Sequence, residues 1–326
     1  MQLYIDKENL QSFISNSKDP LYADCTKTMQ RQLDLTFNFS KEALKTDEIL
    51  LKWFSVLTEG VNDTKKEFNE AKFPNRPLKS NSYNSFDLNQ LSAIYLINDD
   101  KINVLKDKGA ILIGDIGEEI EVFKQLFLHH NDYKFDKKLL IGGAEFLSWK
   151  HLEKYSFVTS DILVFDPYIL SDSSLIESNL TSYLKILCSK IRCTVNIVIY
   201  LEFDKMNVEY SSISSEIRKS IKSVTGINPN LTIIKYRKQK NMASAAEHDR
   251  TIFTNYFRVY SGDSFNYFDS AGSKITNGRE IHYSCFADRE NHRLAIDLIQ
   301  SIQEKLNQIP PEQILGDKKS NFLKFS

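Results

Sequence analysis

The residues best suited to chemistry lie in the segment 247–268, which begins Glu-His-Asp-Arg. His248 stands between two acids, and its imidazole could act near neutral pH as a nucleophile or a proton shuttle. Arg250 follows two residues later, so on a strand it would leave on the same face as His248. A guanidinium beside an imidazole forms a phosphate-binding pair. We therefore identify His248, Arg250 and Glu247 as the candidate catalytic residues.

Further groups that could bind a phosphate flank this pair. A basic run from Lys235 to Lys240 leads toward His248, and with Tyr236 among its cations it could attract a phosphodiester backbone. Neutral donors follow the pair, and Gly262 permits a tight turn among them. The candidate phosphate- or nucleic-acid-binding residues are Lys235, Arg237, Lys238, Lys240, Asn255, Ser261 and Ser264.

A purely structural interpretation of the same residues stays open. In it, Arg250 pairs with Glu247 or Asp249, His248 caps a strand, and the basic run is a solvated loop. The sequence alone does not decide between the two.

The elements that must position these residues predict an α/β fold. From residue 91, short apolar runs alternate with amphipathic helical patterns, and the runs include 161–166, 195–201, 231–234 and 251–259. Continuous apolar strands of this kind predict a mixed sheet covered by helices on both faces. In such sheets ligands bind at the carboxyl ends of the strands, which is where Asp166, Tyr168 and Asp204 would lie.

The chain is expected to have four parts. Residues 1–60 show amphipathic helical spacing after a short apolar strand and form a mainly helical N-terminal region. Residues 61–90 are polar, contain two prolines and are predicted to be a loop or linker. Residues 91–309 form the α/β domain, and residues 310–326, after Pro310 and Pro311, form a C-terminal tail.

Composition limits the kinds of partner. Among 326 residues, 42 Lys and Arg balance 43 Asp and Glu, so any attraction to nucleic acid must come from a local patch. The four cysteines lack a CxxC spacing and a nearby histidine, which predicts reduced thiols and no metal site. Neither a signal peptide nor a run of about 18 to 20 apolar residues is present. We therefore expect a soluble, cytoplasmic protein without a membrane partner, and we predict no cofactor.

The segment from His248 resembles the C-terminal half of the phospholipase-D-like superfamily. Members use a His-x-Lys motif and a downstream acid to cleave phosphodiesters through a phosphohistidine, without a metal. The resemblance spans about residues 85–305 and places His248 at the nucleophile position, Arg250 at the lysine position and Asn255 at a downstream Asp or Asn. The stretch from Ser261 to Asn266 resembles the Gly-Ser-x-Asn element.

Two departures from the motif favour binding over catalysis. Arg250 replaces the lysine with a planar fork of donors. Only one motif occurs, because in His151-Leu152-Glu153-Lys154 the lysine comes one position late, so an active site would require a homodimer. Inactive members of the superfamily bind phosphates, proteins or lipids. The resemblance thus implies a degenerate phospholipase-D-like domain that binds a phosphodiester or nucleic acid.

Other functions remain as alternatives. The chain could be an active phosphodiesterase or nuclease that uses His248, or a non-catalytic subunit of a hetero-complex that docks through its aromatic segment 253–268 and the tail residues 322–325. The Lys-, Asn-, Ile- and Ser-rich composition is typical of an AT-rich, bacterial source. A helical region joined to a degenerate nuclease-like domain is typical of bacterial defence against phage.

A rival resemblance involves the N-terminus. Leu3 to Leu10 resembles the opening of PIN-like nucleases of the NYN type, and Ser261-Gly262-Asp263-Ser264 resembles their later Ser-Gly-Asp element. That likeness implies a Mg²⁺ or Mn²⁺ site made of Asp6, Asp166 and Asp263, if the fold brings these acids together.

Overall fold

The chain divides into two compact α/β units, which confirms the predicted fold class. Unit 1 comprises Met1–Tyr83, Asp87–Phe135 and Cys285–His292, and unit 2 comprises Asn84–Phe86, Asp136–Ser284 and Arg293–Ser326. The computed structural model describes residues 1–37, 39–59, 65–68, 92–96, 115–126, 136–191, 193–202, 209–236 and 250–325.

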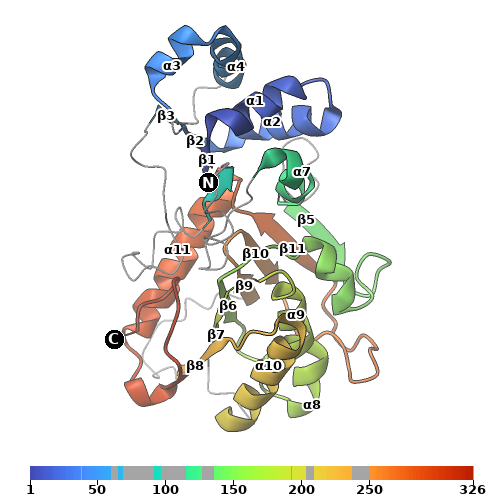
Figure 1. The fold of residues 1–326 in the computed structure, drawn as a ribbon. Helices are drawn as coiled ribbons and strands as arrows, with labels where there is room; N and C mark the ends of the chain where they lie inside the picture. Colours follow the sequence, from blue (N-terminus) through green and yellow to red (C-terminus); the bar gives the residue numbers. More distant parts are fainter. Residues whose placement is uncertain are drawn as a thin grey trace. The chain divides into compact units, whose positions relative to one another are not determined.

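Unit 1 is built on a parallel sheet of four strands in the order β3-β2-β1-β4 (Figure 1). Its strands are β1 (Gln2–Ile5), β2 (Asp34–Phe37), β3 (Lys66–Phe68) and β4 (Ile94–Leu96). Its helices are α1 (Lys7–Ser15), α2 (Pro20–Gln32), α3 (Lys41–Thr46), α4 (Glu48–Thr58) and α7 (Ile116–Gln125). Side-chain caps begin the first four: Asp6, Asp19, Ser40 and Asp47 each accept a backbone N–H of the first turn.

The division between the units differs from the boundary expected at residue 91. The region predicted to be mainly helical, 1–60, contributes two strands, and the predicted linker contributes β3. β4 and α7 also belong to unit 1, so unit 2 begins only at residue 136, apart from the short stretch 84–86. β1 is the short apolar strand that the sequence predicts at the start of this region. β2 and β3, of four and three residues, carry too few apolar positions to show a period, so the sequence pattern did not reveal them.

Unit 2 contains a mixed sheet of eight strands in the order β12-β8-β7-β6-β9-β10-β11-β5. Its centre is three parallel strands, β6 (Asp161–Phe165), β7 (Asn196–Glu202) and β8 (Asn230–Tyr236). β9 (Arg250–Phe253) runs antiparallel to β6, and β10 (Phe257–Ser261) returns antiparallel to β9. The outer strands are β11 (Glu280–Cys285), β5 (Asp136–Leu140) and β12 (Ile314–Gly316).

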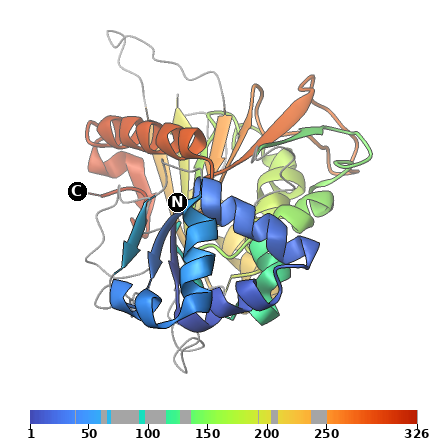
Figure 2. The same ribbon diagram turned by 90° about the horizontal axis from the view of Figure 1, so that it is seen from above.

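Helices cover both faces of this sheet, as the sequence predicts. α8 (Ser173–Ile176), α9 (Ser182–Leu187) and α10 (Tyr210–Thr225) gather on one side of the strands, and α11 (Arg289–Leu306) lies on the other (Figures 1 and 2). A π-helical turn, Glu177–Thr181, joins α8 to α9, and a 3₁₀ segment, Trp149–Tyr155, precedes β6. On the α11 side, Lys305 Nζ lies 5.5 Å from the centre of the Phe165 ring.

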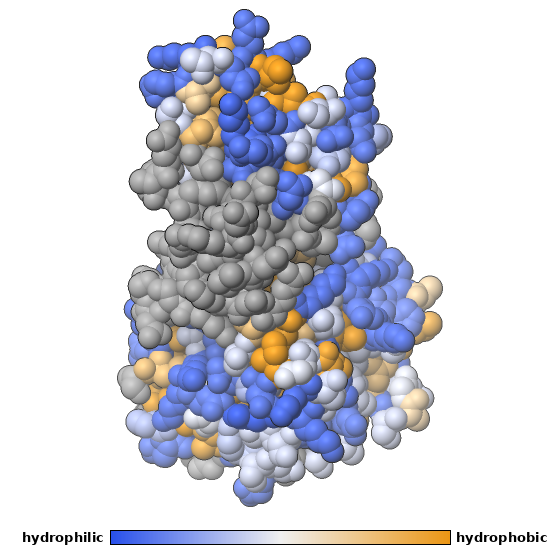
Figure 3. Space-filling model, in the orientation of Figure 1, coloured by the Kyte–Doolittle hydropathy of each residue, from blue (hydrophilic) through white to orange (hydrophobic). Residues whose placement is uncertain are grey.

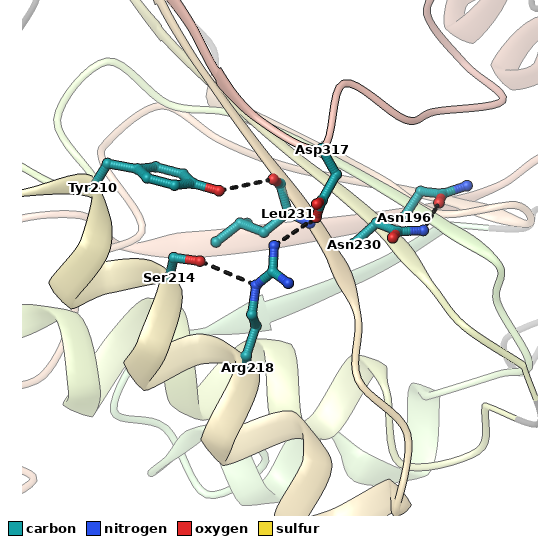
Figure 4. A network of polar contacts seen from close by, with 7 residues as sticks. All are labelled: Asn196, Tyr210, Ser214, Arg218, Asn230, Leu231 and Asp317. Carbon is teal, nitrogen blue, oxygen red and sulfur yellow. Dashed lines mark hydrogen bonds and ion pairs between the residues drawn. The ribbon is translucent and has the colours of Figure 1, made fainter.

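The residues predicted to form a C-terminal tail are instead built into unit 2. β12 pairs antiparallel with β8, and Asp317 accepts hydrogen bonds from Leu231 N at 2.7 Å and Arg218 Nη2 at 2.5 Å (Figure 4). Gly316 has φ +100°, and a Cβ there would lie 2.1 Å from the Leu231 carbonyl oxygen, so only glycine fits. The apolar side chain of Phe322 is 1% exposed. Polar anchors of this kind have no periodicity, and the sequence pattern therefore missed them.

Candidate functional site

One edge of the unit 2 sheet collects the carboxyl ends of β6, β7 and β8, and Arg250 begins β9 at the same edge. Phe165 pairs with Thr251, so the next residue of β6, Asp166, lies opposite Arg250. Arg250 in turn pairs with Ser261, the last residue of β10. This is the edge where open α/β sheets bind ligands. We call it the Arg250 edge.

Asp166 organises the loops of the Arg250 edge from a fully buried position. Its carboxylate accepts hydrogen bonds from Tyr168 N at 2.9 Å, Ser264 Oγ at 2.8 Å and Phe265 N at 2.8 Å. Burial raises the pKa of the Asp166 carboxyl, although these donors and the nearby Arg250 charge favour its ionised form. Asp166 thus joins the turn after β6 to the segment after β10.

Arg250 is half-buried and held on two sides. Its Nη1 donates to the Gly262 carbonyl oxygen at 3.0 Å, and its guanidinium carbon lies 5.6 Å from the centre of the Tyr168 ring. A guanidinium carries five donors in a rigid fork, a set that suits the paired oxygens of an anion. The structure therefore orients a permanent positive charge at the carboxyl edge of the sheet.

Three of the predicted site residues, Arg250, Ser261 and Ser264, lie close together at this edge, and a fourth, Lys235, lies farther along it. Besides Arg250, Ser261 accepts the Asp263 N–H through its hydroxyl at 3.2 Å, and Ser264 donates to Asp166. Lys235 is the penultimate residue of β8, three strands away from Arg250. The other basic candidates and two of the three candidate catalytic residues lie outside the described residues: Arg237, Lys238, Lys240, Glu247 and His248.

The structure does not bring Asn255 to the Arg250 edge. Asn255 lies in the turn between β9 and β10, fully buried, where its Oδ1 accepts from Thr159 Oγ1 at 2.6 Å, Ser160 N at 2.8 Å and Asp161 N at 3.2 Å. Thr159 and Ser160 precede β6 and Asp161 is its first residue, so Asn255 occupies the opposite, amino edge of the sheet. Its role is to fasten the β9–β10 turn to β6, and it is not placed to bind a phosphate with Arg250.

Asn179 is a positioning residue that the sequence did not reveal. In the π-helical turn, its Oδ1 accepts from Tyr267 N at 2.8 Å and Phe268 N at 2.9 Å, and its Nδ2 donates to Phe268 O at 2.7 Å. It thereby fixes the segment that continues from Ser264. One asparagine in an amphipathic helical pattern looks like a solvent-facing residue, so no sequence signal marked it.

The acids predicted for a divalent metal do not form a site in the part of the chain that the structure describes. Asp6 lies in unit 1, where its Oδ1 accepts from Asn9 N at 2.8 Å and Asn9 Nδ2 at 2.9 Å. Asp166 and Asp263 lie in unit 2, and Asp263 accepts from Ser264 N and Thr276 Oγ1. Among the described residues, no three His, Cys, Asp or Glu side chains are grouped to hold a metal ion.

The aromatic segment proposed as a docking surface is instead part of the core. Phe253, Phe257, Phe265 and Phe268 are each at most 3% exposed, and the tail's Leu323 is 1% exposed.

Among the residues of unit 1 that the structure describes, the exposed large apolar side chains are Ile49, Leu51 and Val56 of α4. α1, α2 and α4 line a groove of about 830 Å³ beside these side chains. Figure 3 shows this apolar surface over α4.

Neither a membrane-spanning helix among the described residues nor a known relative is found. Within the described residues no helix is both long and apolar enough to cross a membrane. Comparison of the sequence with protein-family models and with curated proteins finds no match.

Proposed function

We propose that unit 2 binds the phosphodiester backbone of nucleic acid at the Arg250 edge. The observation that carries this proposal is the fixed guanidinium of Arg250, held between the Gly262 carbonyl and the Tyr168 ring where parallel strands end. Planar guanidinium donors match phosphate oxygens in pairs, and the charge of arginine does not depend on pH in the neutral range.

Two further observations support a phosphate as the ligand. Asp166, which lies opposite Arg250 in the strand register, is fully buried, so it is shielded from a ligand at the surface. The resemblance of this segment to phospholipase-D-like domains implies the same ligand chemistry. Arginine at the lysine position favours binding without cleavage.

Fluorescence anisotropy with a labelled 20-nucleotide single strand tests the proposal. We expect Arg250→Gln to weaken binding about tenfold, the cost of one charge-assisted hydrogen bond, and Arg250→Lys to weaken it less. Arg279 is an exposed arginine of unit 2, and Arg279→Gln serves as the matched control. Equal affinities for wild type and Arg250→Gln, with matching thermal unfolding, would refute the proposal.

Cleavage is measured separately, because the alternative function makes His248 a nucleophile. The labelled strand is incubated with the protein in EDTA, and products are resolved by electrophoresis. A protein that only binds leaves the strand intact. Cleavage that is lost in His248→Gln would instead establish a metal-independent phosphodiesterase.

A further inference from the structure

We infer that the Arg250 edge binds two separate phosphates of one extended nucleic-acid strand, with Arg250 and Lys235 as the two anchoring cations. This inference rests on the proposed function and specifies its ligand: a polymer rather than a single phosphate headgroup.

The strand register places the two cations in one row across the sheet. Lys235 pairs with Leu201, and the preceding residue of β7, Tyr200, pairs with Phe165 of β6. Leu201 therefore lies beside Asp166, which lies opposite Arg250. Residues in one row point to the same face of a sheet, so Lys235 and Arg250 share a face.

The spacing of the row is wider than one phosphate group. From β8 to β9 there are three strand-to-strand steps, β8 to β7, β7 to β6 and β6 to β9. Neighbouring strands lie about 4.8 Å apart, so the two backbones are separated by roughly 14 Å.

The two cationic groups do not converge across this gap. The Arg250 guanidinium donates to Gly262, which follows β10, on the side of β9 away from Lys235. Between the two cations lie Leu201 and Asp166, both fully buried. The row therefore presents two half-buried cations separated by covered side chains.

A nucleic-acid strand that contacts both cations binds with higher affinity because its phosphates are covalently connected. Once one phosphate is bound, the next contact forms within the same complex, so a polymer binds more tightly than its separate units. Each neutralised phosphate also adds about 0.7 to the slope of log affinity against log salt concentration for a single strand. A lone headgroup could reach only one of the two cations.

The test compares a labelled 12-nucleotide strand with a dinucleotide that carries one phosphodiester. We expect Arg250→Gln to weaken both ligands about tenfold. Lys235→Gln should weaken the 12-mer about tenfold, lower its salt slope by about 0.7 and leave the dinucleotide unchanged. Lys235→Arg, which keeps the positive charge, should bind the 12-mer as tightly as wild type does. Lys219→Gln, at an exposed lysine of α10, is the control and should leave binding of both ligands unchanged.

Three other results would overturn the inference, each in a different way. If only Arg250→Gln weakens the 12-mer, the second anchor is wrong and the proposed function stands. If neither oligonucleotide binds, both fail. If Arg250-dependent binding appears only with vesicles containing anionic phospholipid, the ligand is a lipid headgroup instead of a strand.

Discussion

At the scale of the residue, Asp166 links the loops that surround the candidate site. One carboxylate satisfies three donors from two segments in a place without solvent. An asparagine has a single acceptor oxygen and turns its NH₂ group toward at least one of these donors. The backbone N–H of Tyr168 or Phe265 would then lose its partner.

We therefore expect Asp166→Asn to lower the free energy of unfolding by about 2 kcal/mol, the cost of a buried unsatisfied donor. Because the Ser264 segment would loosen, nucleic-acid binding should weaken as well. Urea unfolding and anisotropy measure the two effects. Asp172→Asn is the control, since asparagine also caps a helix and Asp172 caps α8 at the surface. Unfolding of Asp166→Asn at the wild-type urea concentration would contradict this account.

At the scale of the element, the sequence predicts which segments form strands better than it predicts where the chain reverses direction. The long apolar runs at 161–166, 195–201 and 231–234 correspond to β6, β7 and β8. They could be predicted because a strand that is buried on both faces is a continuous run of apolar residues. The apolar run 251–259 predicts one strand, but a turn at 254–256 divides it into β9 and β10. Apolar residues flank the turn on both sides and conceal it. That reversal is why Asn255 lies far from Arg250.

The hairpin turn supplies a prediction at this scale. Asn255→Ala would leave the buried N–H groups of Ser160 and Asp161 without their acceptor. At about 1 to 3 kcal/mol for each group, we expect a loss of at least 2 kcal/mol in the free energy of unfolding. Urea denaturation checks this value, with Ser270→Ala at an exposed turn as the control. A loss below about 0.5 kcal/mol, typical of a surface substitution, would show that the turn is not fastened through Asn255.

At the scale of the whole molecule, buried titratable groups in the two units change stability in opposite directions with pH. In unit 2, burial raises the pKa of Asp161 and Asp166, so their folded forms hold protons that the unfolded chain has released. Their contribution to stability falls as pH rises from the ordinary aspartate range. In unit 1, burial lowers the pKa of His292 to about 4. Its unfolded form binds the extra proton, so stability is lost as pH falls from about 6.5 toward 4.

Each unit contains one of the two tryptophans, Trp53 in unit 1 and Trp149 in unit 2, so the units can be followed separately. In a Trp149→Phe background, Trp53 fluorescence reports the urea unfolding of unit 1. The folded imidazole of His292 is 9% exposed and packs against Phe286. Between pH 7 and pH 5 we expect the free energy of unfolding of unit 1 to fall by about 2 kcal/mol, because the imidazole becomes protonated in the unfolded chain but not in the folded one. His292→Leu keeps an apolar side chain there and should abolish most of this loss, whereas His151→Gln, at an exposed histidine of unit 2, should retain it. An equal loss in wild type and His292→Leu would mean that other groups control the acid response of unit 1.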